Sequence, residues 1–512
     1  MIRKLSQWTT LSLVAVLALS ACSGLIPVAL DSQTLNEEPT QSRMGEAEPT
    51  VAAVPPTNSI LLTPEQAPKA TPVSSKILAH PQGCSPASLP KSVLMFTWSD
   101  RQSGHLLFPV DASTGQPLCA YEPISLGYQF FHSFSPDGSL LALTVSDRED
   151  GRNSVLEWID LKNWQLIKSP IEFEDWITAI AYSPDGQKLA ITATGAISEQ
   201  GSASDSSQVA VIDNVSQTLQ AERAVDLSPT MLEFTRDGSA LVAYGSAENP
   251  DDQTGQVAQV ALLDSTTLEP LWSTPLAGVI YGNTPVEESE DDPEGFESWE
   301  PAIVYAPDQE ALYIVHADSN RLTTVDINAR TIRSADILTA TSWLERLLAL
   351  TAGTAHAKTL DGHFKTAVLS PDGSRLYILS RTADSFQDED GNWQFSETSH
   401  GLDVVEVATA AQLFHRNTDA TDLEFSADGH SLFLRSWMDQ GWTEVLDANS
   451  LSTIAHLADR HITRGRQLDG QPVLLSTVYH ENGQTTMAII DPDTHEDIYM
   501  GWTVLWASWL IK

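Results

Sequence analysis

Short apolar segments separated by turn-forming residues recur along the chain from Lys91 to the carboxyl end. In one example, ITAIAY at Ile177–Tyr182 precedes the turn residues SPDG, and KLAIT at Lys188–Thr192 follows them. Such short runs, rich in β-branched and aliphatic residues and bounded by Pro, Asp and Gly, predict β-strands joined by hairpins. We therefore predict that this part of the chain is all β.

The turn between the first two strands of each unit has nearly the same sequence at every occurrence. Proline presets φ at the first central position, aspartate accepts local backbone hydrogen bonds, and glycine takes positive φ. The copies are FSPDG at Phe134–Gly138, YSPDG at Tyr182–Gly186, FTRDG at Phe234–Gly238, YAPD at Tyr305–Asp308, LSPDG at Leu369–Gly373, FSADG at Phe425–Gly429 and a weaker QLDG at Gln467–Gly470.

A second repeated phrase is an apolar strand that ends in aspartate. Because aspartate accepts hydrogen bonds from the backbone of the turn that follows it, we interpret these residues as hairpin caps and not as catalytic groups. One unit has Glu406 at this place. The aspartates are Asp111, Asp160, Asp213, Asp264, Asp326, Asp447 and Asp491.

Together the two phrases define units of four strands at a spacing of roughly 50 residues, which is typical of a β-propeller. The first unit lacks an innermost strand, whereas the apolar stretch Thr503–Ile511 is left over after the last unit. Pairing of this stretch with the first unit would leave no open sheet edge. The prediction is a single all-β propeller over residues 91–512, closed by the carboxyl-terminal strand joining blade one. It has eight four-stranded blades, or seven if one unit is degenerate.

The PDG turns resemble those of the WD40-like propellers in bacterial TolB-type proteins and in YVTN-type surface proteins. The resemblance covers the chain from Lys91 to its end, whereas the GH and WD pairs of eukaryotic WD40 blades are absent. Proteins of these families mostly bind partners, although some propellers of this type lie beside hydrolase domains. The resemblance therefore implies the fold and indicates the function only weakly.

The amino terminus has the features of a targeting signal. Arg3 and Lys4 precede the apolar run Leu11–Ala21, which is shorter than the roughly 20 residues of a membrane span. The run ends in Leu19-Ser20-Ala21-Cys22, which resembles the lipobox of bacterial lipoproteins. The resemblance implies that residues 1–21 are a signal peptide and that lipidated Cys22 anchors the protein to a membrane of the cell envelope, on its extracytoplasmic side. The alternative is an ordinary signal peptide with an incidental cysteine.

Residues 22–90 are rich in Pro, Thr, Ser, Ala and Glu and show no hydrophobic period. Such a segment cannot bury enough apolar surface to offset its ordering entropy, so we predict a disordered tether. Cys84 and Cys119 are the two cysteines left after lipidation. Outside the cytosol a pair tends to oxidise, so we predict a disulfide between them, with two separate buried thiols as the alternative.

The chain carries 68 acidic residues against 28 Lys and Arg, for a formal net charge of -40. This charge repels the phosphate backbone and excludes nucleic acid as an expected partner. It either keeps an exported protein soluble or favours a cationic ligand. We expect a monomer.

The predicted topology places the longer connections of the propeller on one rim. The connections between first and second strands are tight, whereas those between second and third strands, and between blades, are longer. Long loops on a rigid scaffold commonly carry function. The long connections are Thr194–Ser207, Glu248–Gly255, Arg381–Gly401, Gly282–Glu300 and Ser334–Gly362, of which the last contains a predicted helix at Thr341–Gly353.

Two of these connections are strongly acidic. Clustered carboxylates suit a hard cation, so calcium is a possible ligand, although no other cofactor is expected and the simpler interpretation is a solvated loop. Aromatic residues in the same segments either grip a sugar or peptide ligand or pack onto the rim. The candidate ligand residues are Glu290, Asp291, Asp292, Asp388, Asp390 and Glu397, and the candidate aromatic contacts are Phe296, Trp299 and Trp393.

The signatures of common hydrolase, zinc-protease and phosphate-binding sites are missing from the sequence. Three histidines, His316, His363 and His430, could converge in space. We therefore expect a membrane-anchored binding or assembly module that holds an envelope protein, or another cationic, peptide or sugar ligand, on its acidic long-loop rim. The alternative is a secreted enzyme, a hydrolase or lyase or a quinoprotein-like catalyst, with carboxylates on the same rim.

Overall fold

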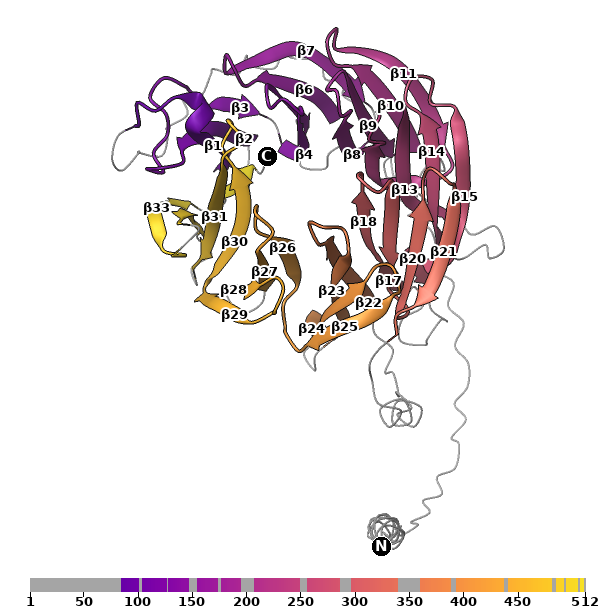
Figure 1. The fold of residues 1–512 in the computed structure, drawn as a ribbon. Coiled ribbons are helices and arrows are strands. Elements are labelled where there is room, and N and C mark those ends of the chain that lie inside the picture. Colours follow the sequence, from indigo (N-terminus) through magenta and orange to yellow (C-terminus); the bar gives the residue numbers. More distant parts are fainter. Residues whose placement is uncertain are drawn as a thin grey trace, which may run out of the picture. The chain divides into compact units, whose positions relative to one another are not determined.

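The structure of the chain is a computed structural model, which describes residues 84–100, 104–126, 128–146, 154–173, 176–194, 207–248, 256–285, 296–338, 360–387, 393–436, 441–480, 485–491, 494–504 and 507–510. These residues form eight antiparallel blades around a central axis, which Figure 1 shows end-on. The prediction of an all-β propeller with eight four-stranded blades is thereby confirmed. Cys22, the signal peptide and the predicted helix at Thr341–Gly353 lie outside the described residues. No helix among the described residues is both long and apolar enough to cross a bilayer.

Each blade is numbered along the chain, and its strands are given from the axis outward. Blade 1 consists of β34 (Ala507–Leu510), β1 (Ser92–Asp100), β2 (Gly104–Asp111) and β3 (Ile124–Leu126), preceded by the short 3-10 helix η1 (Leu89–Lys91). Blade 2 consists of β4 (Tyr128–Phe134), β5 (Leu140–Ser146), β6 (Ser154–Asp160) and β7 (Gln165–Phe173). Blade 3 consists of β8 (Trp176–Tyr182), β9 (Lys188–Thr194), β10 (Ser207–Asp213) and β11 (Thr218–Val225). Blade 4 consists of β12 (Ser228–Phe234), β13 (Ala240–Glu248), β14 (Gln256–Asp264) and β15 (Pro270–Ile280).

The second half of the ring follows the same plan, with one added hairpin. Blade 5 consists of β18 (Ala302–Ala306), β19 (Ala311–Val315), β20 (Arg321–Asp326) and β21 (Thr331–Asp336). Blade 6 consists of β22 (Leu360–Leu369), β23 (Arg375–Gln387), β24 (Trp393–Glu406) and β25 (Ala411–Arg416), and the hairpin β16 (Gly282–Pro285) and β17 (Phe296–Glu300) joins its inner edge. Blade 7 consists of β26 (Asp422–Phe425), β27 (Ser431–Ser436), β28 (Trp442–Asp447) and β29 (Thr453–Ala458). Blade 8 consists of β30 (Arg460–Arg466), β31 (Pro472–Tyr479), β32 (Thr485–Ile490) and β33 (Asp497–Val504).

The ring closes through the carboxyl-terminal strand. Strand β34 pairs antiparallel with β1, with Leu94 opposite Leu510 and Thr97 opposite Ala507. Blade 1 is thus built from both ends of the propeller, as the leftover apolar stretch predicted. Closure removes the open sheet edges that the first and last units would otherwise present.

The repeated turns pack against one another around one rim. In five of them a Ser or Thr two residues before the aspartate donates a short hydrogen bond to the aspartate, as Ser370 does to Asp372 at 2.6 Å. This bond and those from Ser374 lower the pKa of Asp372 to about 2. Gly186 and Gly429 adopt positive φ and face a proline of the preceding turn, Pro136 and Pro371, at distances that leave little or no room for a Cβ atom. Glycine is therefore required both by the backbone and by the neighbouring blade.

The strand-ending aspartates cap the turns between the third and fourth strands, as predicted. Asp264, for example, accepts backbone hydrogen bonds from Thr266 at 2.9 Å and from Thr267 at 2.8 Å. Four residues after the cap, the chain takes positive φ, in most blades without glycine. At several of these positions the side chain is buried between blades, so the packing of that side chain offsets the strain of its backbone. These buried residues are Trp164, Leu268, Ala410 and Leu451.

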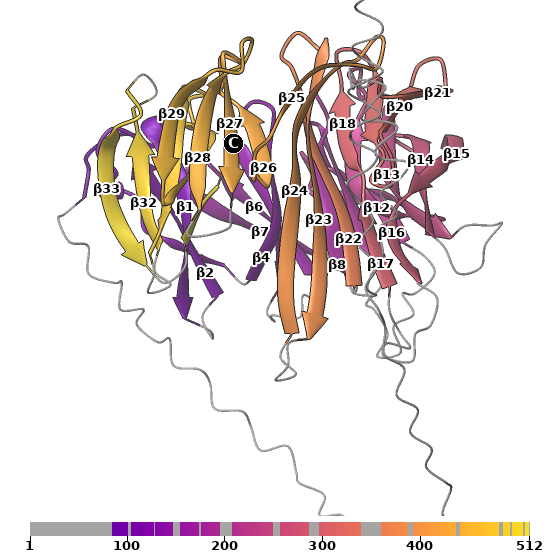
Figure 2. The same cartoon turned by 90° about the horizontal axis from the view of Figure 1, so that it is seen from below.

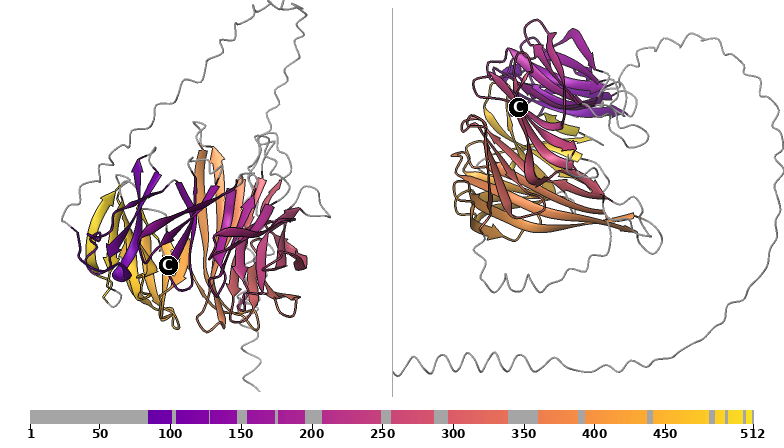
Figure 3. Two further views of the ribbon diagram at one scale, coloured as in Figure 1. Left: turned by 90° about the horizontal axis from the view of Figure 1, so that it is seen from above. Right: turned by 90° about the vertical axis from the view of Figure 1, so that its right-hand side faces the viewer.

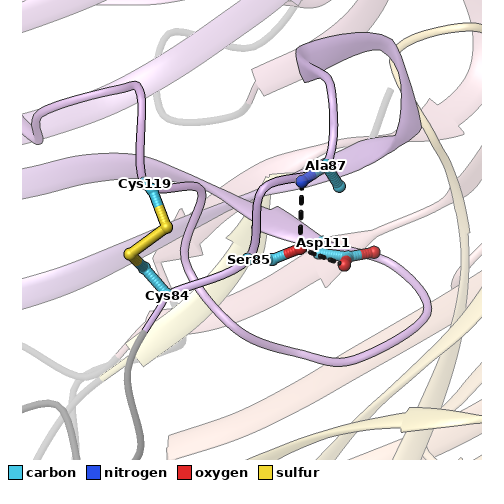
Figure 4. Close-up of a disulfide and its surroundings, with 5 residues drawn as sticks. All are labelled: Cys84, Ser85, Ala87, Asp111 and Cys119. Atoms are coloured by element: carbon cyan, nitrogen blue, oxygen red, sulfur yellow. Dashed lines mark hydrogen bonds between the residues drawn. A yellow bond between two sulfur atoms is a disulfide. The ribbon is translucent and has the colours of Figure 1, made fainter.

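Cys84 and Cys119 form a disulfide at the start of the described chain, with their Cα atoms 5.0 Å apart (Figure 4). Next to it, the Ser85 hydroxyl donates to Asp111 Oδ2 at 2.6 Å, and the Cys119 amide donates to the Ser85 carbonyl at 2.9 Å. The segment that follows the predicted tether is thereby fixed to the outer part of blade 1.

The predicted loop at Arg381–Gly401 is wrong in its extent. Strands β23 and β24 pair from Arg375 opposite Glu406 as far as Gln387 opposite Trp393. The segment is rich in polar and charged residues and therefore resembles a loop in composition, although its backbone pairs across the two strands with one register shift at Ser380/Arg381.

We expect reduction of the disulfide to destabilise the propeller by about 3–4 kcal/mol, because the bond closes a loop across a sequence separation of 35. Urea denaturation with and without dithiothreitol measures the difference. A variant with both cysteines replaced by alanine is the control, and its unfolding should not respond to the reductant. Equal unfolding midpoints of the oxidised and reduced wild-type protein would contradict the prediction.

Candidate functional site

A step in height between blades 5 and 6 creates a groove on the described surface of the propeller. The strands of blade 5 have five or six residues each, whereas β23 and β24 have 13 and 14. These two strands extend past their neighbours on the rim that carries the long connections, as Figures 2 and 3 show. One face of blade 6 therefore rises above the short turn that joins β19 to β20.

The hairpin β16–β17 extends this wall toward the axis. In the sequence, this hairpin lies between blades 4 and 5, but it joins blade 6 and not blade 5. Its strand β17 pairs parallel with β22, with Trp299 opposite His363. The two rings stack with centroids 4.1 Å apart and planes 7° apart, and His363 Nε2 lies 3.1 Å from Glu297 Oε1. Backbone pairing, ring stacking and this polar contact together fix the hairpin to blade 6.

The resulting groove has a volume of about 1040 Å³. Its floor is the blade 5 turn at Ala317–Asn320, and its wall consists of the central parts of β22, β23, β24 and β25. Both chain insertions that flank blade 5 begin and end beside this region, at Gly282–Glu300 and after Asp336. A short blade between two insertions is thus the local reason for the groove.

Lys365 connects the wall to the floor. Its Nζ donates to the Ser319 carbonyl oxygen at 2.8 Å. Burial lowers the pKa of Lys365 to about 8, although the charges of Asp403 and Asp318 act in the opposite direction. The amine therefore loses its charge at a lower pH than an ordinary lysine.

Asp403 and His415 form a pair on the same wall. Asp403 Oδ1 lies 2.7 Å from His415 Nδ1, and Gln412 also donates to this oxygen. The hydrogen bond with Asp403 raises the pKa of His415, and a second contact joins His415 Nε2 to Asn417 Oδ1 at 3.1 Å. His415 thus keeps its proton to a higher pH than an ordinary imidazole.

The paired strands also hold Glu397, one of the residues predicted as a cation ligand. Its two carboxylate oxygens each lie 3.1 Å from Arg381 Nη1, and the Arg381 guanidinium lies over the Phe364 ring at 4.9 Å from its centroid. Glu397 is therefore part of an ion pair across β23 and β24 in this structure. Among the described residues, no group of three His, Cys, Asp or Glu could hold a metal ion.

The remaining predicted residues fall into two groups. Trp299 lies beside the groove on β17, and Phe296 and Trp393 lie at the first positions of β17 and β24. His316 and His363 lie on the long-connection rim, whereas His430 follows a tight turn on the opposite rim, so the suggested convergence of three histidines is wrong. The predicted residues outside the described chain are Glu290, Asp291, Asp292, Asp388 and Asp390.

Lys365, Asp403 and His415 are not among the site residues that the sequence predicted. Each is a charged or titratable residue within an otherwise regular strand, so the alternating pattern marks it only as a position on one face. Their proximity depends on the pairing of β22 with β23, β23 with β24, and β24 with β25. No spacing in the sequence indicates it.

A second, smaller cavity of about 650 Å³ lies among the inner strands near the tight turns. Glu233 lines it, and burial raises the pKa of this carboxyl to about 7. Glu424 occupies the matching strand position in blade 7 and is paired with Arg464 at 2.9 Å. The sequence did contain a signal for these two glutamates. Leu-Glu-Phe occurs at 232–234 and 423–425, and in other blades the position of the glutamate is occupied by Ser133, Ala181, Val304 or Val368.

The likeness to known proteins is one of fold. No family model matches the chain, and no curated protein matches it. The solved structure of "Dihydro-heme d1 dehydrogenase NirN in complex with DHE" has 12% identity and a TM-score of 0.51, over 86% of this chain and 78% of that chain. Hydrazine synthase of Kuenenia stuttgartiensis has 15% identity and a TM-score of 0.41, over 72% of this chain and 97% of that chain. The β-propeller domain of Cps50 (Swd1) of Myceliophteria thermophila has 15% identity and a TM-score of 0.36, over 74% of this chain and 98% of that chain.

We expect the substitution Asp403→Asn to lower the pKa of His415 toward its ordinary value, because the charged acceptor that stabilises the imidazolium is lost. A titration of the histidine ring protons by NMR measures this change. Asp308→Asn, on the opposite rim, is the control and should leave the His415 titration as it is in the wild type. A His415 pKa that is the same in both variants would show that Asp403 does not hold the proton.

Proposed function

We propose that this chain is an envelope-anchored binding module, whose ligand occupies the groove between blades 5 and 6. The observation that carries the proposal is the step from a short blade to a tall one, which leaves a large polar groove in a rigid ring. Ligand sites of this size are commonly concave, largely preformed and lined by a few polar groups. The groove lies on the rim where the sequence concentrates its long connections.

The chemistry of the groove favours binding over hydrolysis. Hydrolases of the carboxylate type need two acids in different protonation states, one of them desolvated. In the described groove, the two lining acids, Asp318 and Asp403, both act on the charge of Lys365. Both acids therefore lie near the same cation, an arrangement that suits recognition of a ligand more than general-acid catalysis.

The proposed location rests on the amino terminus. The sequence Leu19-Ser20-Ala21-Cys22 after a short apolar run supports lipidation of Cys22. About 60 residues of Pro- and Ser-rich tether, with an average reach of roughly 45 Å, would hold the propeller away from the bilayer. The ligand would then be an envelope protein or a small molecule of the extracytoplasmic space.

Filling the groove should abolish ligand binding without unfolding the ring. Ser380 lies on the groove wall next to Lys365, so we expect Ser380→Trp to occupy the site. Thr331→Trp, on the exposed outer strand of blade 5, is the matched control. The measurement is the amount of ligand from envelope extract that each immobilised protein retains. The tryptophan at 380 should reduce retention roughly tenfold or more, and equal retention by both variants would exclude the groove as the site.

Replacement of Cys22 by alanine should release the protein from the membrane fraction, because the lipid chains that anchor it cannot be attached. Cell fractionation after metabolic labelling with a fatty acid measures both location and lipidation. The Cys84→Ala variant keeps Cys22 and should remain labelled and membrane-bound. Labelling of the Cys22→Ala variant would refute lipidation at this residue.

A further inference from the structure

The groove is less acidic than the chain as a whole. In the full sequence, acidic residues outnumber Lys and Arg by 68 to 28. Among the residues that line the groove, two Lys or Arg residues, Lys365 and Arg381, stand against two acids, Asp318 and Asp403. Three histidines, His363, His400 and His415, also line it, and the hydrogen bond with Asp403 raises the pKa of His415, which adds positive charge. A concave site with low-dielectric walls concentrates this local charge toward its interior.

The two acids already make polar contacts in the structure. Asp403 accepts hydrogen bonds from His415 and Gln412, and Asp318 accepts one from the Ser319 hydroxyl at 3.2 Å. Their acceptor capacity is therefore partly used within the protein. By contrast, the bond from Lys365 to the Ser319 carbonyl uses one of the three N–H donors of an ammonium group. Lys365 therefore keeps N–H donors beyond its bond to Ser319.

We propose that the groove binds an oxyanion, the carboxylate or phosphate of a small ligand, with Lys365 as its principal contact. This inference rests on the proposed function, since it assigns the class of ligand to the same groove. A hydrogen bond between a charged donor and a charged acceptor is among the stronger contacts that a polar site can make. Thr382 and His400, whose side chains are joined at 3.3 Å, lie on the same wall and offer further polar atoms.

Binding of this kind depends on pH in a defined direction. The Lys365 amine has a pKa of about 8, so its charge is present below pH 8 and is lost as the pH rises through that value. The hydrogen bond to Asp403 raises the pKa of His415, which adds positive charge at lower pH. An anion should therefore bind best at neutral or mildly acidic pH. The charged and titratable groups that line the groove around Lys365 are Asp318 of the β19–β20 turn, His363 on β22, Arg381 on β23, His400 and Asp403 on β24, and His415 on β25.

Isothermal titration of the full-length protein with succinate, inorganic phosphate and glucose at pH 7 tests the class of ligand. We expect at least one of the two anions to bind and glucose to bind more weakly. The relative affinities of succinate and phosphate distinguish a carboxylate site from a phosphate site. Lys365→Met should weaken binding of the preferred anion by about tenfold or more. Lys162→Met, at an exposed turn of blade 2, is the control and should not change it.

A second variant separates the loss of charge from a loss of structure. Succinate keeps the same charge between pH 7 and pH 9.5, so its wild-type affinity should fall roughly tenfold over this range as Lys365 deprotonates. Lys365→Arg keeps a permanent charge and should retain most of its affinity at pH 9.5. A wild-type affinity that does not change with pH, or stronger binding of glucose than of either anion, would overturn the proposal.

The two proposals fail in different ways. If Ser380→Trp abolishes retention of the envelope ligand while Lys365→Met does not, the groove is a binding site but its ligand is not an oxyanion held by Lys365. If neither substitution affects retention, the groove itself is not the site. Loss of retention in both variants, together with the expected pH dependence of succinate binding, supports both proposals.

Discussion

The packing of each blade against its neighbours is the interaction on which the structure depends. Within the part of the chain that the structure describes, the buried hydrophobic residues separate into eight clusters, and each cluster joins two adjacent blades. The cluster between blades 8 and 1, for example, combines Met95 and Val110 with Leu475 and Met487. A blade therefore cannot bury its two faces alone. Because every core is shared, the ring is complete only when the strand β34 closes it against β1.

Shared cores also explain how the two kinds of turn are used. The tight turns place glycine against a proline of the preceding blade, so that neighbouring turns support one another. The aspartate-capped turns place a side chain such as Leu268 into the core between two blades while its backbone has positive φ. In both cases a local turn contributes to contact between blades. The repeated sequence phrases thus encode both hairpins and the way in which blades meet.

The candidate site arises where this regular plan is interrupted. Blade 5 is short and blade 6 is tall, and the chain inserts a hairpin before blade 5 that pairs with the inner strand of blade 6. The ring itself is not disturbed, because the shared cores on both sides of blade 5 are intact. The rigid packing below the groove holds Lys365, Asp403 and His415 in fixed positions, which lowers the ordering entropy that a ligand would otherwise have to overcome.

Charge has different roles at different places in this acidic chain. Most turn aspartates are held by hydrogen bonds from nearby Ser, Thr and backbone groups, which lower their pKa and keep them ionised, as at Asp137 and Asp372. In the groove, Lys365, Asp403 and His415 make contacts that run across strands. In the second cavity, Glu233 lies among the inner strands, and its pKa is raised to about 7. The net charge of the chain therefore does not predict the chemistry of its sites.

The sequence by itself determined the all-β class, the four-strand unit and the closing strand, and it left the number of blades at eight or seven. The reason is that turn chemistry and apolar periodicity are local and are repeated in each blade. It also determined the turn role of residues such as Asp264. Only the tertiary structure decided that blade 5 leaves a groove, that β17 pairs with β22, and that Lys365 lies near Asp403. These relations depend on strand length, register and pairing between segments far apart in the sequence, and no single spacing along the chain encodes them.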